Sequence, residues 1–345
     1  MNKFLIGSVL GLVVLTVVVL YFSIGHMNLA PTPCNEKDVL VVGWDGSRRA
    51  KVEELLGNGE LPNLQKLIDK GSYIQVNIHE GRTDTKAGWA QIWTGYSASR
   101  TGVYSNRKYR PIPAGWTAFE RLRAQFGDSI RTAFVSGKIN NIGARGPHKI
   151  CENCKSRFDD TRGKTHYWDE SKTPELKIKG EKPRYVEREG EPYFHAKPKL
   201  DFYQNALGES SHVMQAGLDW IEKNRDKPFL AFLHFEEPDE LGHLYGENST
   251  EYHQALINND RNLAEILRRV PPAKNRPLIT FVLSDHGFNP GEKEHGEAPE
   301  TFWVSDMPGL VASADRRDFT PTLLQLYCLS TNAIDPPLDG RSLRP

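Results

Sequence analysis

Carboxylate and imidazole side chains recur directly after two apolar runs of the sequence. Asp239 and His243 lie in Glu-Pro-Asp-Glu-Leu-Gly-His, which follows the run 229–235, and Asp285 and His286 follow the run 278–284. The three residues between Asp239 and His243 allow one helical turn to present both side chains. His295 comes nine residues after His286. Mixed oxygen and nitrogen ligands of this kind bind divalent metal ions, and the imidazole content favours zinc over calcium.

Asp45 provides a third carboxylate in the same kind of position, after the apolar run 39–43. In open α/β sheets, ligands bind outside the carboxyl ends of the strands. Each aspartate taken alone could instead cap a helix or form a turn. Three Asp and three His residues on converging loops would saturate one ion in a closed structural site. Alternatively, they would hold two ions with open positions for a substrate oxygen.

A nucleophile is expected beside such metals, and the segment 82–95 offers Thr85 at the start of a predicted helix. The positive end of the helix dipole stabilises an alkoxide and the anion that it attacks, and metal coordination lowers the hydroxyl pKa further. The alternative is that Thr85 is only a helix N-cap and Thr83 the end of a strand.

The elements that must position these residues alternate between apolar runs and amphipathic segments. Runs at 39–43, 132–136, 229–235 and 278–284 predict strands buried on both faces, and 203–224 and 250–270 predict helices. Helical spacing of apolar residues also follows the first strand, between 52 and 68. This pattern predicts an α/β fold, a three-layer α/β/α sandwich with a mainly parallel central sheet.

The amino-terminal segment 1–25 is a separate feature. Lys3 precedes an uncharged apolar run that is long enough to cross a bilayer. It is either a membrane anchor, which its length favours, or a signal peptide cleaved near Ser23-Ile-Gly25. We therefore expect a membrane-anchored protein with its ectodomain outside the cytoplasm, or a secreted one. Residues 26–38 form a linker, and 39–345 form the main domain.

The overall composition excludes some partners. Lys+Arg and Asp+Glu both number 44, so the formal net charge of zero does not direct the protein to nucleic acid.

Cys151 and Cys154 form a lone C-x-x-C, which we interpret as a local disulfide or two free thiols rather than half of a zinc site. Cys34 and Cys328 are far apart, and their spacing does not indicate a pair.

The segment 145–199 is rich in Lys, Glu, Gly and Pro, and is either a cap beside the site or a surface excursion without function.

Taken together, these motifs resemble the alkaline phosphatase superfamily, and most closely its type I phosphodiesterase/nucleotide pyrophosphatase branch. The resemblance runs from about residue 39 to 343, so that 39–345 is identified as an alkaline-phosphatase-like catalytic domain. It rests on an ordered set of motifs: Asp45-Gly46, Leu61-Pro-Asn-Leu64, Thr85 before Thr94-Gly95, Gly102-Val-Tyr-Ser-Asn106, Glu237-Pro-Asp239-x-x-Gly-His243 and Ser284-Asp-His-Gly287.

The resemblance implies a role for each residue of the set. Asp239, His243 and His295 would hold one metal ion. Asp45, Asp285, His286 and the Thr85 oxygen would hold the other. Thr85 would attack phosphorus in line and form a phosphothreonine intermediate, which water then hydrolyses. Two divalent ions are implied, with zinc expected and manganese as the alternative.

The sequence also departs from the family pattern. Gly88 stands where the phosphodiesterase branch has Asn, three residues after the nucleophile. Lys86, Asn106 or Lys138 would then supply the missing contact to phosphate, although a solvated surface lysine is the common alternative. The short spacing from His286 to His295 is similar to compact sulfatase-like members, but Ala87-Gly88-Trp89 replaces the Pro-Ser-Arg of a sulfatase nucleophile motif.

The function implied by this resemblance is an exported, metal-dependent hydrolase of phosphodiesters or related phosphoesters. One alternative is a phosphoethanolamine-type head-group transferase that uses the same groups, and another is a non-catalytic metal- or phosphate-binding homologue. The expected partner is a small-molecule or lipid phosphoester, with the membrane as a second partner if 1–25 is retained.

Aromatic residues gather around the nucleophile and would either stack on a leaving group or pack in the core. They are Trp89, Trp93, Tyr96, Tyr104, Tyr109 and Trp116.

Overall fold

The computed structural model describes residues 34, 36–139, 141–151, 182 and 184–345. Its centre is an eight-stranded sheet with the strand order β10-β2-β9-β8-β1-β7-β3-β6. The strands are β1 (Asp38–Trp44), β2 (Ser72–Asn77), β3 (Arg131–Ser136), β6 (Phe202–Gln204), β7 (Phe229–Phe235), β8 (Leu278–Leu283), β9 (Glu300–Ser305) and β10 (Ser313–Ala314). β9 runs antiparallel to both of its neighbours, and the remaining pairings are parallel.

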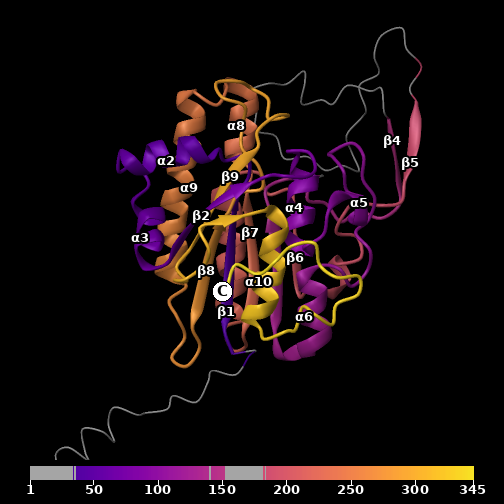
Figure 1. The fold of residues 1–345 in the computed structure, drawn as a ribbon, viewed down its shortest axis with the longest axis vertical. Helices are drawn as coiled ribbons and strands as arrows, with labels where there is room; N and C mark the ends of the chain where they lie inside the picture. The colour runs from indigo at the N-terminus through magenta and orange to yellow at the C-terminus, as the bar shows by residue number, and fades with distance from the viewer. Residues whose placement is uncertain (1–33, 35, 140, 152–181, 183) are drawn as a thin grey trace, which may run out of the picture. The chain divides into compact units, whose positions relative to one another are not determined.

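Helices cover both faces of this sheet (Figure 1). They are α2 (Arg49–Gly57), α3 (Pro62–Lys70), α4 (Thr85–Thr94), α5 (Ala98–Thr101), α6 (Ala118–Phe126), α7 (Ser210–Lys223), α8 (Glu237–Tyr245), α9 (Thr250–Arg269) and α10 (Phe319–Leu326). Alternate residues of β1 face different cores: Val39 and Val41 pack with α4, α6 and α10, while Leu40 and Val42 pack with α2, α3, α7 and α9. Burial on both faces explains the continuous apolar runs of the central strands. The predicted three-layer sandwich with a mainly parallel sheet is confirmed.

The predicted elements match the observed ones closely, with one exception. The helix predicted over 203–224 begins only at Ser210, because Phe202–Gln204 forms the edge strand β6 beside β3. Three residues are too few for a periodic pattern to distinguish an edge strand from the start of a helix. The predicted helix over 250–270 corresponds to α9, whose Ser249 side chain caps Tyr252 N–H.

The predicted insertion at 145–199 is described only in part. A two-stranded antiparallel ribbon joins β4 (His148–Cys151) and β5 (Tyr185–Arg188). Tyr193 and Ala196 belong to the main hydrophobic core, so the carboxyl-terminal end of this segment is integral to the domain. Cys154 lies outside the described residues, so its predicted pairing with Cys151 stays a prediction.

The predicted membrane segment 1–25 likewise lies outside the described residues. Among the residues that the structure does describe, no helix is both long enough and apolar enough to span a bilayer.

A disulfide joins Cys34 to Cys328, across 294 residues of sequence. Sequence spacing did not indicate this pair, because the contact arises from the fold: β1 lies in the middle of the sheet and α10 covers it. Lys37 reinforces the junction by donating a hydrogen bond of 2.6 Å to the carbonyl of Leu326. A cross-link that closes such a long loop removes much conformational freedom from the unfolded chain.

We expect the double substitution Cys34→Ser/Cys328→Ser to lower the free energy of unfolding by about 2–5 kcal/mol. Urea unfolding of the purified protein, followed by tryptophan fluorescence, measures this difference. With reductant present, the wild type should fall to the stability of the double variant. Equal stability of the two proteins under oxidising conditions would contradict the expectation.

Candidate metal centre

The predicted ligands converge where three neighbouring strands end. β8, β1 and β7 are adjacent and parallel, so their carboxyl ends lie at the same edge of the sheet. Asp45 follows β1, Asp285 and His286 follow β8, and Asp239 lies in the first turn of α8 just after β7. The side chains of all four residues are almost fully buried.

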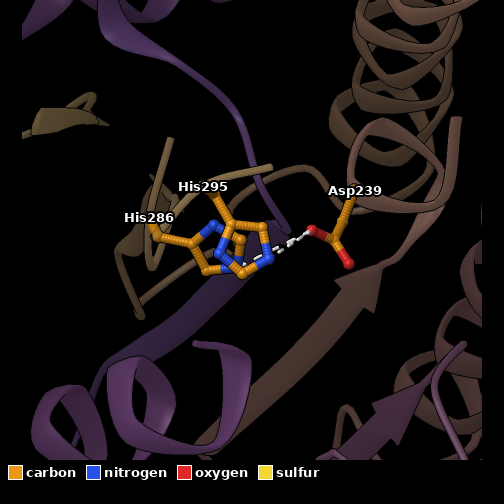
Figure 2. A group of neighbouring side chains, drawn as sticks. All are labelled: Asp239, His286 and His295. Carbon is orange, nitrogen blue, oxygen red and sulfur yellow. Dashed lines mark ion pairs between the residues drawn. The ribbon is translucent and has the colours of Figure 1, made fainter. Parts of the chain in front are cut away.

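Two overlapping groups of potential ligand atoms form here. Asp239, His286 and His295 make one group and Asp45, Asp285 and His286 the other, with the ligand atoms of each group all within 4.8 Å of one another. In Figure 2 the rings of His286 and His295 lie side by side and face the carboxylate of Asp239. Their Nε2 atoms are 3.8 and 3.7 Å from Asp239 Oδ1.

His243 and Thr85 complete the two groups. His243 Nε2 lies 3.0 Å from His295 Nε2 and 3.5 Å from Asp239 Oδ1. Thr85 Oγ1 donates to Asp45 Oδ1 at 3.5 Å, and His286 Nε2 is 3.3 Å from the same oxygen. All seven predicted metal ligands therefore meet. The structure differs from the predicted division in one respect: His286 is close to both groups.

Several ligand atoms have no other partner. Among the described residues, Asp239 Oδ1, Asp285 Oδ2 and His286 Nε2 are buried without a hydrogen-bond partner. Buried polar atoms are normally paired, and each of these three can bind a cation through a lone pair. The donor set of carboxylates and imidazoles fits zinc or a similar divalent ion.

In two of the imidazoles, a hydrogen bond from Nδ1 to a backbone carbonyl orients the ring so that Nε2 faces the cluster. His243 Nδ1 lies 2.7 Å from the carbonyl of Lys293, and His286 Nδ1 lies 3.0 Å from the carbonyl of Gly287. A carbonyl only accepts hydrogen bonds, so Nδ1 carries a proton in both rings, and Nε2 is the nitrogen that faces the cluster and would bind a metal.

The crowding of charge is visible in the pKa values. Burial and the neighbouring Asp45 carboxylate raise the pKa of Asp285 well above its usual value. Burial, the largest influence, would also raise the pKa of Asp239, but the Lys138 ammonium together with His243 and His286 lowers the value to about 2. Burial and the adjacent His286 lower the pKa of His295 to about 3, which keeps this imidazole neutral and able to bind a metal.

Three further residues were predicted to contact phosphate. Lys138 is buried within the cluster, where Nζ contacts Asp239 Oδ2 and lies 3.7 Å from Asp45 Oδ2. The backbone N–H of Lys86 donates to Asn106 Oδ1 at 2.9 Å, next to Thr85 in the chain. The Lys86 side chain is buried, with Nζ 4.5 Å from the centre of the Tyr109 ring. Neither lysine is a solvated surface residue.

Thr85 is the first residue of α4, and Asp84 occupies the N-cap position without a side-chain cap bond. The alternative that Thr85 is itself the N-cap is therefore wrong.

Among the aromatic residues near Thr85, Trp89, Trp93 and Tyr96 are buried in packing contacts. Tyr104 is 37% exposed, and its ring lies under the ammonium of Lys108.

Two buried polar residues that the sequence analysis missed support the cluster. Arg316 is fully buried and donates to the carbonyls of Glu80, Arg82 and Asp285, so that it joins the loop before Thr85 to a predicted metal ligand. His234 lies 2.9 Å from Asp45. The histidine interrupts an apolar strand five residues before Asp239, which is a recognisable signal, whereas Arg316 lies in an unremarkable charged stretch.

The sequence model described as type I phosphodiesterase / nucleotide pyrophosphatase matches residues 39–328. Venom phosphodiesterase 2 of Crotalus adamanteus is 23% identical over 260 residues, which cover 75% of this chain and 28% of that protein. Ectonucleotide pyrophosphatase/phosphodiesterase family member 1 of Mus musculus is 23% identical over 264 residues, covering 76% and 25% of the two chains. The chain thus spans about a quarter of the length of these curated relatives.

Among solved structures, a protein in the alkaline phosphatase superfamily from Vibrio parahaemolyticus has a TM-score of 0.54 and 15% sequence identity. The match covers 90% of this chain and 70% of that one. At this identity the likeness shows a shared fold.

Gly88 yields a direct test of the cluster. A Cβ atom at this position would lie 2.8 Å from Asp285 Cβ and 3.0 Å from the Asp285 carbonyl oxygen. We expect Gly88→Ala to displace Asp285 and to weaken zinc binding by about tenfold or more. Chelator competition on the purified protein measures the affinity. Gly57→Ala is the matched control, because no atom lies within 4 Å of its added Cβ; unchanged zinc affinity in Gly88→Ala would contradict the expectation.

Proposed function

Because the chain belongs to the type I phosphodiesterase/nucleotide pyrophosphatase family, we propose that it is a metal-dependent hydrolase of phosphodiesters or related phosphoesters. The observation that carries this proposal is the position of Thr85. Its hydroxyl lies at the amino-terminal end of α4, 3.5 Å from Asp45 Oδ1. The same Asp45 oxygen is 3.3 Å from His286, which belongs to both ligand groups.

Thr85 is the proposed nucleophile. The first turn of α4 directs backbone N–H groups and the positive end of the helix dipole toward it, an arrangement that stabilises anions. Attack of Thr85 Oγ on phosphorus would expel the leaving alcohol and form a phosphothreonine. Water would then hydrolyse this ester and regenerate the threonine.

The proposed ligands of two divalent ions are Asp239, His243 and His295 for one, and Asp45, Thr85, Asp285 and His286 for the other. Zinc is proposed over manganese because of the imidazole content. When bound, such ions stabilise the charge that develops on the attacking and leaving oxygens. His243 is 36% exposed in its side chain, so we place the substrate entrance on its side of the cluster.

Asn106 and Lys138 are the proposed phosphate-binding groups. Asn106 is held beside the first turn of α4 by Asp84, whose carboxylate accepts its backbone N–H at 3.0 Å, and by the N–H of Lys86. Its amide NH2 group can therefore donate to an oxygen of the phosphoryl group whose phosphorus Thr85 would attack. Lys138 provides a buried positive charge beside Asp45 and Asp239.

Export from the cytoplasm is proposed from two features. The apolar segment 1–25 has the length of an anchor. The Cys34–Cys328 disulfide is of a kind that persists in oxidising compartments. The proposed substrates are accordingly small-molecule or lipid phosphoesters outside the cytoplasm.

The proposed nucleophile is tested by assaying the zinc-loaded protein against bis-p-nitrophenyl phosphate, p-nitrophenyl phosphate and p-nitrophenyl sulfate. We expect diester turnover that chelation abolishes, and a loss of about 10³-fold or more in kcat for Thr85→Ala. Thr94→Ala is the matched control, because Thr94 is a buried threonine on the same helix whose hydroxyl bonds only to Ala90 and Tyr96 backbone atoms. Full activity of Thr85→Ala, or turnover by the metal-free protein, would exclude this mechanism.

Lys138 is tested by comparing substrates of different charge. A phosphate monoester carries one more negative charge than a diester, so Lys138→Met should reduce kcat/KM for the monoester by about tenfold to a hundredfold and for the diester by less. Both rates are measured at saturating zinc, so that a change in metal affinity does not contribute. Equal losses for the two substrates would show that Lys138 acts on the cluster and not on the phosphoryl group.

A further inference from the structure

His234 is an imidazole placed inside a strand that is buried along its whole length. It is the penultimate residue of β7 and has no exposed surface. Its strand partners are Gly43 on β1 and Ser136 on β3. The ring packs edge-on against Trp89 of the nucleophile helix, with centroids 5.3 Å apart and an interplanar angle of 84°. These contacts leave the imidazole little freedom to reorient.

Both ring nitrogens meet polar atoms. Nε2 lies 2.9 Å from Asp45 Oδ2, and Nδ1 lies 3.1 Å from Ser136 Oγ. The hydroxyl oxygen of Ser136 in turn accepts the backbone N–H of Lys138 at 3.1 Å. The contacts therefore form a continuous path from the backbone of the loop after β3 to the carboxylate of Asp45.

The donor and acceptor roles along this path follow from its two ends. A carboxylate oxygen only accepts, so the 2.9 Å approach of His234 Nε2 to Asp45 Oδ2 favours the tautomer with its proton on Nε2, although the two atoms are not aligned as a hydrogen bond in the structure. In a neutral imidazole Nδ1 is then an acceptor, and the Ser136 hydroxyl donates to it. Ser136 Oγ accepts from Lys138 N–H at 3.1 Å, and its own proton has two acceptors within reach, His234 Nδ1 at 3.1 Å and the Lys138 carbonyl at 3.4 Å, of which Nδ1 is the nearer.

His234 contacts one carboxylate oxygen of Asp45, and the other oxygen faces the metal-binding cluster. Oδ2 lies 2.9 Å from His234 Nε2 and 3.7 Å from Lys138 Nζ, whereas Oδ1 faces His286 at 3.3 Å and Thr85 at 3.5 Å. Lys138 Nζ also contacts Asp239 and Glu240, so loss of His234 would remove the shortest contact that distinguishes Oδ2 from Oδ1.

We propose that His234, oriented by Ser136, is a positioning residue that fixes the Asp45 carboxylate so that Oδ1 serves as the metal-binding oxygen beside Thr85. The inference rests on the proposed metal-dependent function. It concerns the geometry of one ligand and assigns His234 no contact with the substrate.

Two amide variants test the role of each ring nitrogen. The Gln side-chain nitrogen reaches the position of Nε2, so His234→Gln retains a donor to Asp45. The shorter Asn side chain reaches the position of Nδ1, so His234→Asn retains only the Ser136 side. Both replacements are uncharged and smaller than imidazole, so each serves as a control for the lost packing of the other.

The readouts are zinc affinity by chelator competition and the visible absorption spectrum of the cobalt-substituted protein, which reports ligand geometry. Loss of a partner of a metal ligand typically costs about 10–100-fold in metal affinity, and we expect this loss for His234→Asn, with an altered cobalt spectrum. His234→Gln should stay within about threefold of the wild type. Ser136→Ala, which leaves the imidazole in place, should shift affinity in the same direction as His234→Asn but by less.

The outcomes separate the inference from the function on which it rests. Wild-type protein that binds no zinc or cobalt would reject the proposed function itself. Wild-type protein that binds metal while His234→Asn and His234→Gln bind it equally well, or equally poorly, would reject the role of His234 alone. If His234→Asn does not fold, a zinc affinity of Ser136→Ala equal to that of the wild type would overturn the proposal.

Discussion

The rest of the structure depends on the meeting of three buried carboxylates at one edge of the sheet. Asp45, Asp239 and Asp285 are each at most 2% exposed, and buried charges of like sign are costly unless cations compensate them. The protein itself supplies Lys138 and a set of imidazoles. Two divalent ions would supply the larger share of the compensation. The fold therefore stabilises a charge arrangement that favours cations, and the proposed chemistry uses those cations.

Such an arrangement holds only if the loops that carry the ligands cannot separate. Arg316 joins the backbone of the loop before Thr85 to that of Asp285. The loop that carries His295 is fastened through Glu247, whose carboxylate accepts hydrogen bonds from Arg48 and from the backbone of Gly291. Glu247 is fully buried, which makes its pair with Arg48 sensitive to removal of either partner. Rigidity at the centre thus comes from long-range polar contacts added to the parallel strands.

These long-range contacts mark what the sequence could predict and what it could not. The central strands and their terminal ligands were predictable, because burial on both faces produces continuous apolar runs and the ligands follow each run directly. Neither the antiparallel strand β9 nor the Cys34–Cys328 pair follows from local spacing, since both depend on which segments the fold brings together. Arg316 was missed for the same reason: apart from the Gln91 side chain, its partners are backbone carbonyls, and backbone groups leave no pattern in a sequence.

The departure of Gly88 from the family pattern has a steric explanation. Asp285 approaches Gly88 so closely that a Cβ atom there would collide with it, so this position cannot carry an amide side chain toward the substrate. Asn106 instead brings an amide to the first turn of α4 from a separate loop, where its side chain already bonds to the N–H of Lys86. The same kind of group is thereby available beside Thr85 although the residue three positions after the nucleophile has no side chain. A local motif is accordingly a weaker guide to a phosphate site than the geometry, because a loop distant in sequence can deliver the group that the motif lacks.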